Sequence, residues 1–73
     1  MFNDEKEIYD RYSNLIGRIV MYRNGDKMAY DAHGTLLGSY DHSFNITTKH
    51  PSGEIVAHCD AIMLFFPNAD RIW

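Results

Sequence analysis

Glycine-containing turns divide the middle of the chain into short segments, and this spacing constrains the fold more than any other feature of the sequence. The turns lie at Asn24-Gly25, His33-Gly34 and Pro51-Ser52-Gly53. Asn-Gly is the strongest short signal for a β-hairpin, because both central positions of a type I′ turn have positive φ. Short apolar runs joined by such turns predict a meander of hairpins over about residues 18–58.

A different pattern precedes the first of these turns. Asp4 and Glu7 are spaced as in a capping box. Apolar side chains then recur every three or four positions, at Ile8, Tyr12, Leu15, Ile16 and Ile19. This spacing is typical of an amphipathic helix, and Gly17 stands where a left-handed C-terminal cap is common. We therefore predict a helix over about residues 4–16.

The hairpin segments repeat one another. Each has a turn containing glycine, then a strand, then an aspartate, over residues 22–31, 30–41 and 48–60. The closing aspartates are Asp31, Asp41 and Asp60. Carboxylates in such positions accept hydrogen bonds from the backbone of the following loop, so we expect them to stabilise turns.

The stretch Tyr30-Asp31-Ala32-His33-Gly34-Thr35-Leu36-Leu37-Gly38-Ser39-Tyr40-Asp41 resembles the tyrosine-aspartate hairpin repeats of large bacterial toxin shells and of small bacterial β-flower-like proteins. The likeness covers these twelve residues well and about thirty loosely. Arg23 replaces the aspartate in the first copy, and the third copy lacks the tyrosine. The resemblance implies hairpins and implies no activity.

The apolar run Ala61–Phe66 allows either an edge strand or a short buried helix capped by Asp60, and we favour the helix. Pro67 ends this element, and Ile72-Trp73 forms an apolar tip. The expected fold is thus one α+β domain over residues 1–73. In it the N-terminal helix packs on an antiparallel sheet of about five short strands, followed by an apolar C-terminal segment over residues 60–73.

Composition limits both the stability of this fold and its partners. A chain of 73 residues has a thin core, and Cys59 is its only cysteine, so no intrachain disulfide supports it. The net charge is −3 and the basic residues are scattered, which argues against nucleic-acid binding. The sequence has neither an apolar stretch of about 20 residues nor a basic secretory start, so we expect a cytoplasmic protein without membrane contact.

The sequence offers little chemistry for catalysis. The histidines His33, His42, His50 and His58 are spaced 9, 8 and 8 residues apart, which makes His42, His58 and Cys59 weak zinc candidates. No CxxC or HxxxH pattern supports a metal site, so we expect solvated histidines and a buried Cys59. Consecutive strand residues point to opposite faces, so His58 would not activate Cys59. We therefore predict no enzyme, no metal and no cofactor.

Aromatic side chains are more numerous than so small a core requires, and they suggest an interaction surface. The residues we expect there are Tyr22, Tyr30, Tyr40, Phe66 and Trp73, with the acidic Asp4, Glu5, Glu7 and Asp10. They predict a small protein-binding module that contacts a larger protein or complex, for example a mobile-element inhibitor of host defence such as an anti-CRISPR. The alternatives are a self-assembling structural protein, such as a homodimer, and a metal- or thiol-dependent enzyme.

Overall fold

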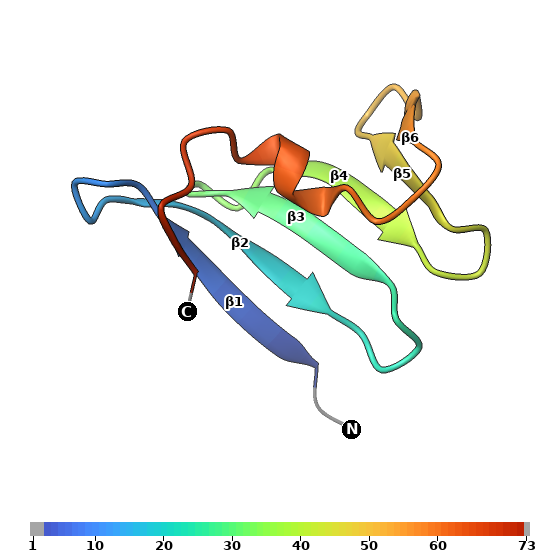
Figure 1. Ribbon diagram of the computed structural model, residues 1–73, viewed down its shortest axis with the longest axis horizontal. Coiled ribbons are helices and arrows are strands. Elements are labelled where there is room, and N and C mark those ends of the chain that lie inside the picture. Colours follow the sequence, from blue (N-terminus) through green and yellow to red (C-terminus); the bar gives the residue numbers. More distant parts are fainter. Residues whose placement is uncertain (1–2, 73) are drawn as a thin grey trace.

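The computed structural model describes residues 3–72, which form one antiparallel sheet of seven strands (Figure 1). The order across the sheet is β6-β5-β4-β3-β2-β1-β7. The strands are β1 Asp4–Tyr9, β2 Leu15–Met21, β3 Lys27–Asp31, β4 Leu36–Asp41, β5 Ile46–Lys49, β6 Ile55–Ala57 and β7 Arg71–Ile72. The first six strands form a simple meander, and the last strand returns to pair with the first. The turn spacing predicted this meander for about residues 18–58, which leaves out the first strand.

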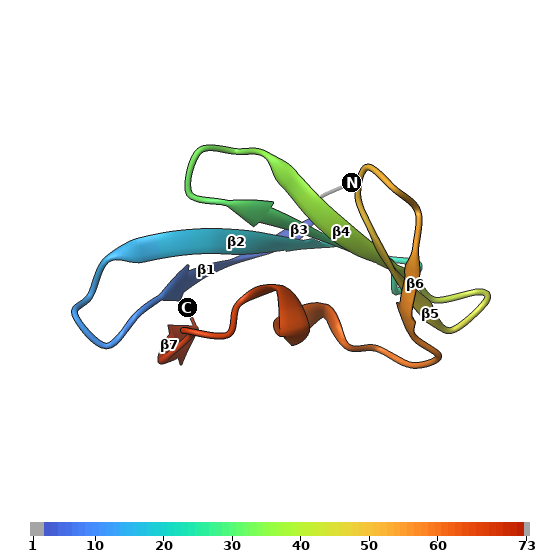
Figure 2. The ribbon, with the colours of Figure 1, turned by 90° about the horizontal axis from the view of Figure 1, so that it is seen from above.

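The segment between β6 and β7, residues 58–70, crosses one face of the sheet, and we call it the strap. It contains a short 3-10 helix, η1, at Ile62–Phe65, which packs against β3 and β4. Figure 2 shows the strap on one side of the sheet only. The other side, which we call the open face, is covered by no second layer of residues 3–72.

The predicted N-terminal helix is wrong, because residues 4–16 form β1, a turn and the start of β2. The carboxylate of Asp10 organises this turn, since its Oδ1 accepts the backbone N–H groups of Tyr12 and Asn14 at 2.9 Å each. Ser13 takes the left-handed conformation, with a φ of 66°. Over residues 3–72 the fold is therefore nearly all β, with seven strands in place of the expected five, and the α+β assignment is wrong.

The turn at Asn24-Gly25 joins two strands as predicted, but it is not type I′. Only Gly25 has positive φ, at 98°. The N–H of Gly25 donates to the carbonyl of Tyr22 at 3.0 Å, and the N–H of Tyr22 donates to the carbonyl of Asp26 at 2.9 Å. These bonds close a three-residue loop over residues 23–25, and its last residue, Gly25, takes the left-handed conformation.

Three hairpins in the sheet share one construction. The pairs β1–β2, β3–β4 and β5–β6 each have an irregularity of register at the same point, next to their turn. Beyond it, a fully buried residue faces a small one across the pair: Ile8 with Gly17, Ala29 with Gly38, and Thr47 with Ala57. The repeat that the structure shows is thus a hairpin with a small residue on the strap side.

The first two small residues lie under the phenylalanines of the strap. A Cβ atom on Gly17 would overlap the ring of Phe66, and one on Gly38 would overlap the ring of Phe65. Such a Cβ atom would also overlap the backbone carbonyl of Tyr30 at Gly17 and that of Thr48 at Gly38, so the aromatic ring and the neighbouring strand together require glycine at both positions. We call these two contacts sockets.

The buried core is as thin as the chain length predicted. Its apolar members are Ile8, Ile19, Ala29, Tyr40, Ile62 and Phe66. The apolar run Ala61–Phe66 forms a 3-10 turn in place of the short buried helix that we favoured. Only Ile62 of its four helical residues is buried, and Ala61 occupies the N-cap position where we expected Asp60.

Candidate functional site

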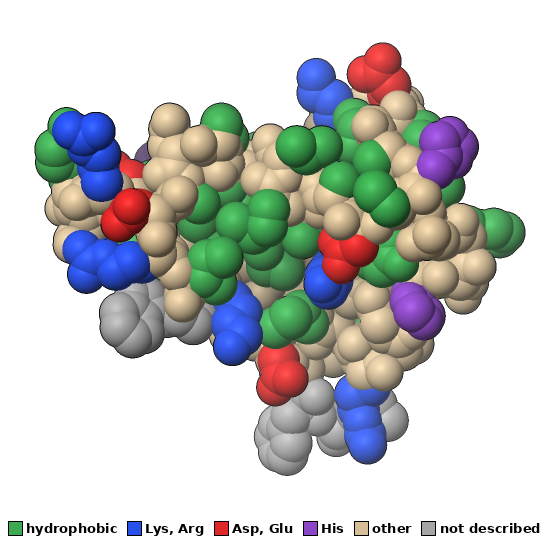
Figure 3. Space-filling model, viewed as in Figure 1, with side chains coloured by type: hydrophobic (Ala, Val, Ile, Leu, Met, Phe, Trp, Pro, Cys, Tyr) green, Lys and Arg blue, Asp and Glu red, His purple; other side chains and the backbone are tan. Residues whose placement is uncertain are grey.

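The strap and the end of strand β6 border an apolar hollow of about 550 Å³, which is open to the surface at one corner of the sheet. The residues lining it are Lys27, Ala57, Cys59, Asp60, Ala61, Ile62, Met63 and Leu64. We call this hollow, together with β6, the corner site. Figure 3 shows the strap side of the molecule, where hydrophobic side chains gather over the middle of the face.

A buried threonine holds the strap in the position that forms the hollow. Thr47 Oγ1 donates a hydrogen bond to the carbonyl of Cys59 at 2.7 Å and accepts one from the N–H of Ala61 at 3.0 Å. Thr47 is fully buried, so both bonds form away from competing water. The strap therefore leaves the edge of the sheet at a fixed point.

Large apolar side chains are exposed around the hollow. Met63 and Leu64 are the two residues after the buried Ile62, and they are 37% and 65% exposed. Ile55 and Val56, which precede Ala57 in β6, are 48% and 38% exposed. Because β6 is the last strand at this side of the sheet, its outer backbone groups have no strand partner within residues 3–72.

An ion pair lies at the rim of the corner site. Lys27 Nζ contacts Asp60 Oδ2 at 2.5 Å, and Asp60 Oδ1 accepts the N–H of Ile62 at 3.3 Å. Both side chains are about one-third exposed, so the pair adds little stability. Its effect is to place one positive and one negative group beside an otherwise apolar surface.

Cys59 is exposed, and the expectation of a buried thiol is wrong. The four histidines are exposed as well. No three histidine, cysteine, aspartate or glutamate side chains lie close enough to hold a metal ion anywhere in residues 3–72. The ring of His42 lies against Gly25, and the backbone N–H of His42 donates to Asp26 Oδ1 at 2.9 Å.

The aromatic residues singled out from the sequence lie in different parts of the molecule. Tyr30 and, by strand alternation, Tyr22 are on the open face, where both are half-buried. The guanidinium of Arg18 lies 5.0 Å above the ring of Tyr30. Tyr40 and Phe66 are core residues and so offer little surface. Trp73 lies outside the described residues.

The acidic residues are likewise divided between the two faces of the sheet. Glu5 and Glu7 alternate with Asp4 along β1, so they point to the open face and Asp4 to the strap side. Glu5 Oε1 lies 3.4 Å from Arg18 Nε, and Glu7 accepts a hydrogen bond from the hydroxyl of Tyr9 at 3.2 Å. Burial, and then Glu7, raise the pKa of Tyr9.

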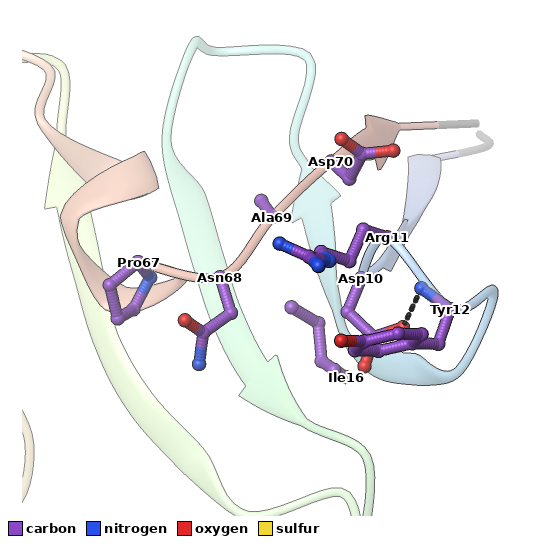
Figure 4. A pocket seen from close by; sticks show the side chains of 8 residues that line it. All are labelled: Asp10, Arg11, Tyr12, Ile16, Pro67, Asn68, Ala69 and Asp70. Carbon is purple, nitrogen blue, oxygen red and sulfur yellow. Dashed lines mark hydrogen bonds between the residues drawn. The ribbon is translucent and has the colours of Figure 1, made fainter.

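A second hollow, of about 460 Å³, lies between the β1–β2 turn and the end of the strap (Figure 4). Arg11 and Tyr12 extend from the turn toward Pro67 and Asn68 of the strap. The guanidinium of Arg11 lies 5.1 Å from the centre of the Tyr12 ring. The carboxylate of Asp10 accepts a hydrogen bond from the backbone N–H of Tyr12 within the β1–β2 turn. This hollow has mixed polarity, and no pair of groups in it suggests acid-base chemistry.

Sequence reasoning considered a sheet edge as the interface of a self-assembling protein, but it did not single out Met63, Leu64 or strand β6 as an interaction surface. One signal was present: six consecutive apolar residues, Ala61–Phe66, cross a single-layer sheet, so some of their side chains must point away from it. Comparisons with protein families, curated proteins and solved structures find no match to this chain. Residues 3–72 contain no helix long and apolar enough to span a membrane.

Proposed function

We propose that the chain is a small non-enzymatic protein-binding module that contacts a larger partner through the corner site. The observation that carries the proposal is the combination of exposed apolar side chains, above all Leu64, with a hollow beside an unpaired edge strand. Apolar hollows accept side chains, and edge strands accept extended segments. Inhibition of a host defence complex is one form that such binding would take.

A protein is the partner that best suits the charge of this surface. Among the described residues, Lys27 is the one basic side chain lining the hollow, and its charge is paired with Asp60. A phosphate backbone would require several unpaired cations. The exposed single thiol of Cys59 suits a reducing compartment, which supports our expectation of a cytoplasmic protein.

Selection from a random peptide library displayed on phage tests the proposal. We expect the immobilised chain to enrich peptides whose binding falls at least about tenfold in Leu64→Ser, since a central apolar contact is lost. Tyr12→Ser is the matched control, because Tyr12 is 72% exposed on the distant β1–β2 turn. Enriched peptides that bind Leu64→Ser as tightly as the parent, or a failure to enrich any, would contradict the proposal.

Self-association is the second candidate, and the sequence of β6 favours it. Glu54 and His58 flank the apolar strand Ile55–Ala57, so two copies pairing antiparallel through β6 would bring each glutamate near the partner's histidine. Sedimentation velocity over a range of concentrations separates the two candidates. A dimer that weakens when His58 is replaced by glutamate would favour self-association.

A further inference from the structure

We propose that Asn24 is a site of spontaneous deamidation, and that the folded β2–β3 turn keeps this side chain unreactive until the turn opens. Asn24-Gly25 is the one asparagine-glycine pair in the sequence. The inference goes beyond the proposed function and does not depend on it, because none of residues 23–26 lines the corner site.

The reaction is easiest where glycine follows asparagine, since glycine has no Cβ atom to obstruct the approach of its own nitrogen. Hydroxide takes the proton of the Gly25 N–H, and the nitrogen attacks Cγ of Asn24. The new N–Cγ bond closes a five-membered succinimide ring, and the side-chain nitrogen takes a proton from water and leaves as ammonia. Water then opens the ring at either carbonyl, which yields aspartate or isoaspartate.

The side chain of Asn24 is exposed, but Asp26 holds both ends of its amide. Asn24 Oδ1 accepts the backbone N–H of Asp26 at 3.0 Å, and Asn24 Nδ2 donates to Asp26 Oδ2 at 3.1 Å. We call these two bonds the amide clamp. The attack makes Cγ tetrahedral and turns the amide out of its plane, so the clamp must break before the ring can close.

The attacking nitrogen of Gly25 is held as well. Its N–H donates to the carbonyl of Tyr22 at 3.0 Å, which keeps its proton within the loop. The ring of His42 covers this glycine, since a Cβ atom at Gly25 would lie 2.7 Å from Cγ of His42. The backbone N–H of His42 donates to Asp26 Oδ1 at 2.9 Å and so ties the β4–β5 turn to the clamp. Deamidation therefore requires the two turns to separate and the β2–β3 turn to open.

Either product would prevent the turn from closing as before. Aspartate at position 24 would place a carboxylate where the amide donates to Asp26, so two like charges would meet. Isoaspartate would add one carbon to the main chain of a loop that spans only three residues. Deamidation would thus make the opening of this hairpin irreversible and mark the molecules that have opened.

The β3–β4 turn supplies a matched control within the same chain. Its loop, residues 32–34, repeats the three-residue construction, because the N–H of Gly34 donates to the carbonyl of Asp31 at 3.1 Å. His33→Asn creates a second asparagine-glycine pair there. The N–H of Thr35 already donates to Asp31 Oδ1, so the new amide has no clamp. Nothing in residues 3–72 lies within 4 Å of a Cβ atom placed on Gly34.

The two positions are compared in the folded His33→Asn variant at mildly alkaline pH. Digestion and mass spectrometry follow the gain of one mass unit at each position. We expect position 33 to convert at least about tenfold faster than Asn24, because two hydrogen bonds must break first at Asn24. In urea that unfolds the chain, the two positions should convert at similar rates. Equal rates in the folded chain, or a faster reaction at Asn24, would overturn the inference.

Asp26→Ala in the His33→Asn background isolates the clamp. It removes the acceptor of Asn24 Nδ2 and that of the His42 N–H. We expect the rate at Asn24 to rise at least about threefold, while position 33 keeps its rate and reports that the rest of the chain is folded. If the variant unfolds, both rates reach their values in urea, and Asp26→Asn, which keeps an Oδ acceptor, replaces it. An unchanged rate at Asn24 in the folded Asp26→Ala variant would overturn the inference.

Discussion

Two aspartates hold two different turns in the same way. Asp10 Oδ1 accepts the N–H groups of Tyr12 and Asn14, and Asp31 Oδ1 accepts those of His33 and Thr35 at 2.8 and 2.9 Å. These bonds lower the pKa of both carboxyl groups, with the N–H of Asn14 and that of Thr35 as the largest causes. Aspartate at these positions therefore stabilises the turns in its charged form.

This arrangement predicts a loss of stability in acid. A carboxyl group whose pKa is lower in the folded chain stabilises the fold above its unfolded pKa, about 3.8, and this contribution disappears as the pH falls through the lower folded value. We expect the free energy of unfolding, measured with urea between about pH 2.5 and pH 6, to decline below about pH 4. Asp31→Asn keeps the Oδ1 acceptor but does not titrate, so its decline should be shallower.

Asp4→Asn is the control for the acid experiment, because Asp4 is exposed in β1 outside any turn. It removes the same formal charge and leaves both turns unchanged. If the pH profile of Asp31→Asn matches that of Asp4→Asn, the turn carboxylates are not the groups that titrate in acid unfolding.

At the scale of elements, the strap is attached to the sheet by its sockets. Gly17→Ala should cost about 1–3 kcal/mol of unfolding free energy, because the added Cβ overlaps the ring of Phe66 and the carbonyl of Tyr30. The double variant Gly17→Ala/Phe66→Leu should lose less unfolding free energy than the two single variants lose together, by at least about 0.5 kcal/mol. Urea unfolding measures all of these values.

The neighbouring phenylalanine supplies a matched control for the first socket. Phe65 lies over Gly38, so Phe65→Leu should couple with Gly38→Ala and be additive with Gly17→Ala. If the losses of unfolding free energy for Gly17→Ala and Phe66→Leu also add up without coupling, the ring of Phe66 does not rest on Gly17 in solution.

The sequence predicted the hairpins well and the first element wrongly. The capping-box spacing and apolar periodicity of residues 4–19 are real, but pairing with β2 overrides them. Glu7 faces Arg18 across this pair, and Ile8 is completely buried against Gly17. Local propensity could not reveal these contacts, because they depend on the partner strand.

A clearer signal for the first hairpin was available in the sequence. Residues 9–17, Tyr-Asp-Arg-Tyr-Ser-Asn-Leu-Ile-Gly, align with residues 30–38, Tyr-Asp-Ala-His-Gly-Thr-Leu-Leu-Gly. This alignment would have placed a turn at Asp10 and a strand at Leu15. The corner site was harder to predict, because it depends on where the strap crosses the sheet, and no local pattern specifies that path.

At the scale of the whole molecule, the chain exposes more surface than its size requires. Its accessible area is 5082 Å², against about 4,700 Å² expected for a folded protein of 8.5 kDa. A single sheet that is covered on one face only leaves more surface accessible than a domain of two complete layers does. Stability in such a fold depends on protecting the edges of the sheet as well as on the core.

The charged half of β1 protects one of these edges. Strand β7 pairs only with Ile8 and Tyr9, which leaves Asp4–Glu7 without an outer partner in residues 3–72. Replacing Glu5 and Glu7 with threonine should therefore cause concentration-dependent association, measured by sedimentation velocity. Replacing both with lysine keeps the edge charged and should preserve the parent's behaviour. Identical sedimentation of the threonine and lysine variants would show that charge does not protect this edge.

The pairing of β7 with β1 joins Ile72 to Ile8, residues from opposite ends of the chain. Each of the six meander strands needs only its neighbour in sequence, so these hairpins form from local contacts, which are quick to make. The strap closes over them through a pairing of long sequence separation, and we expect it to dock last. The corner site would then arise in the final step of folding, so a partner that recognises it would distinguish finished molecules from incomplete ones.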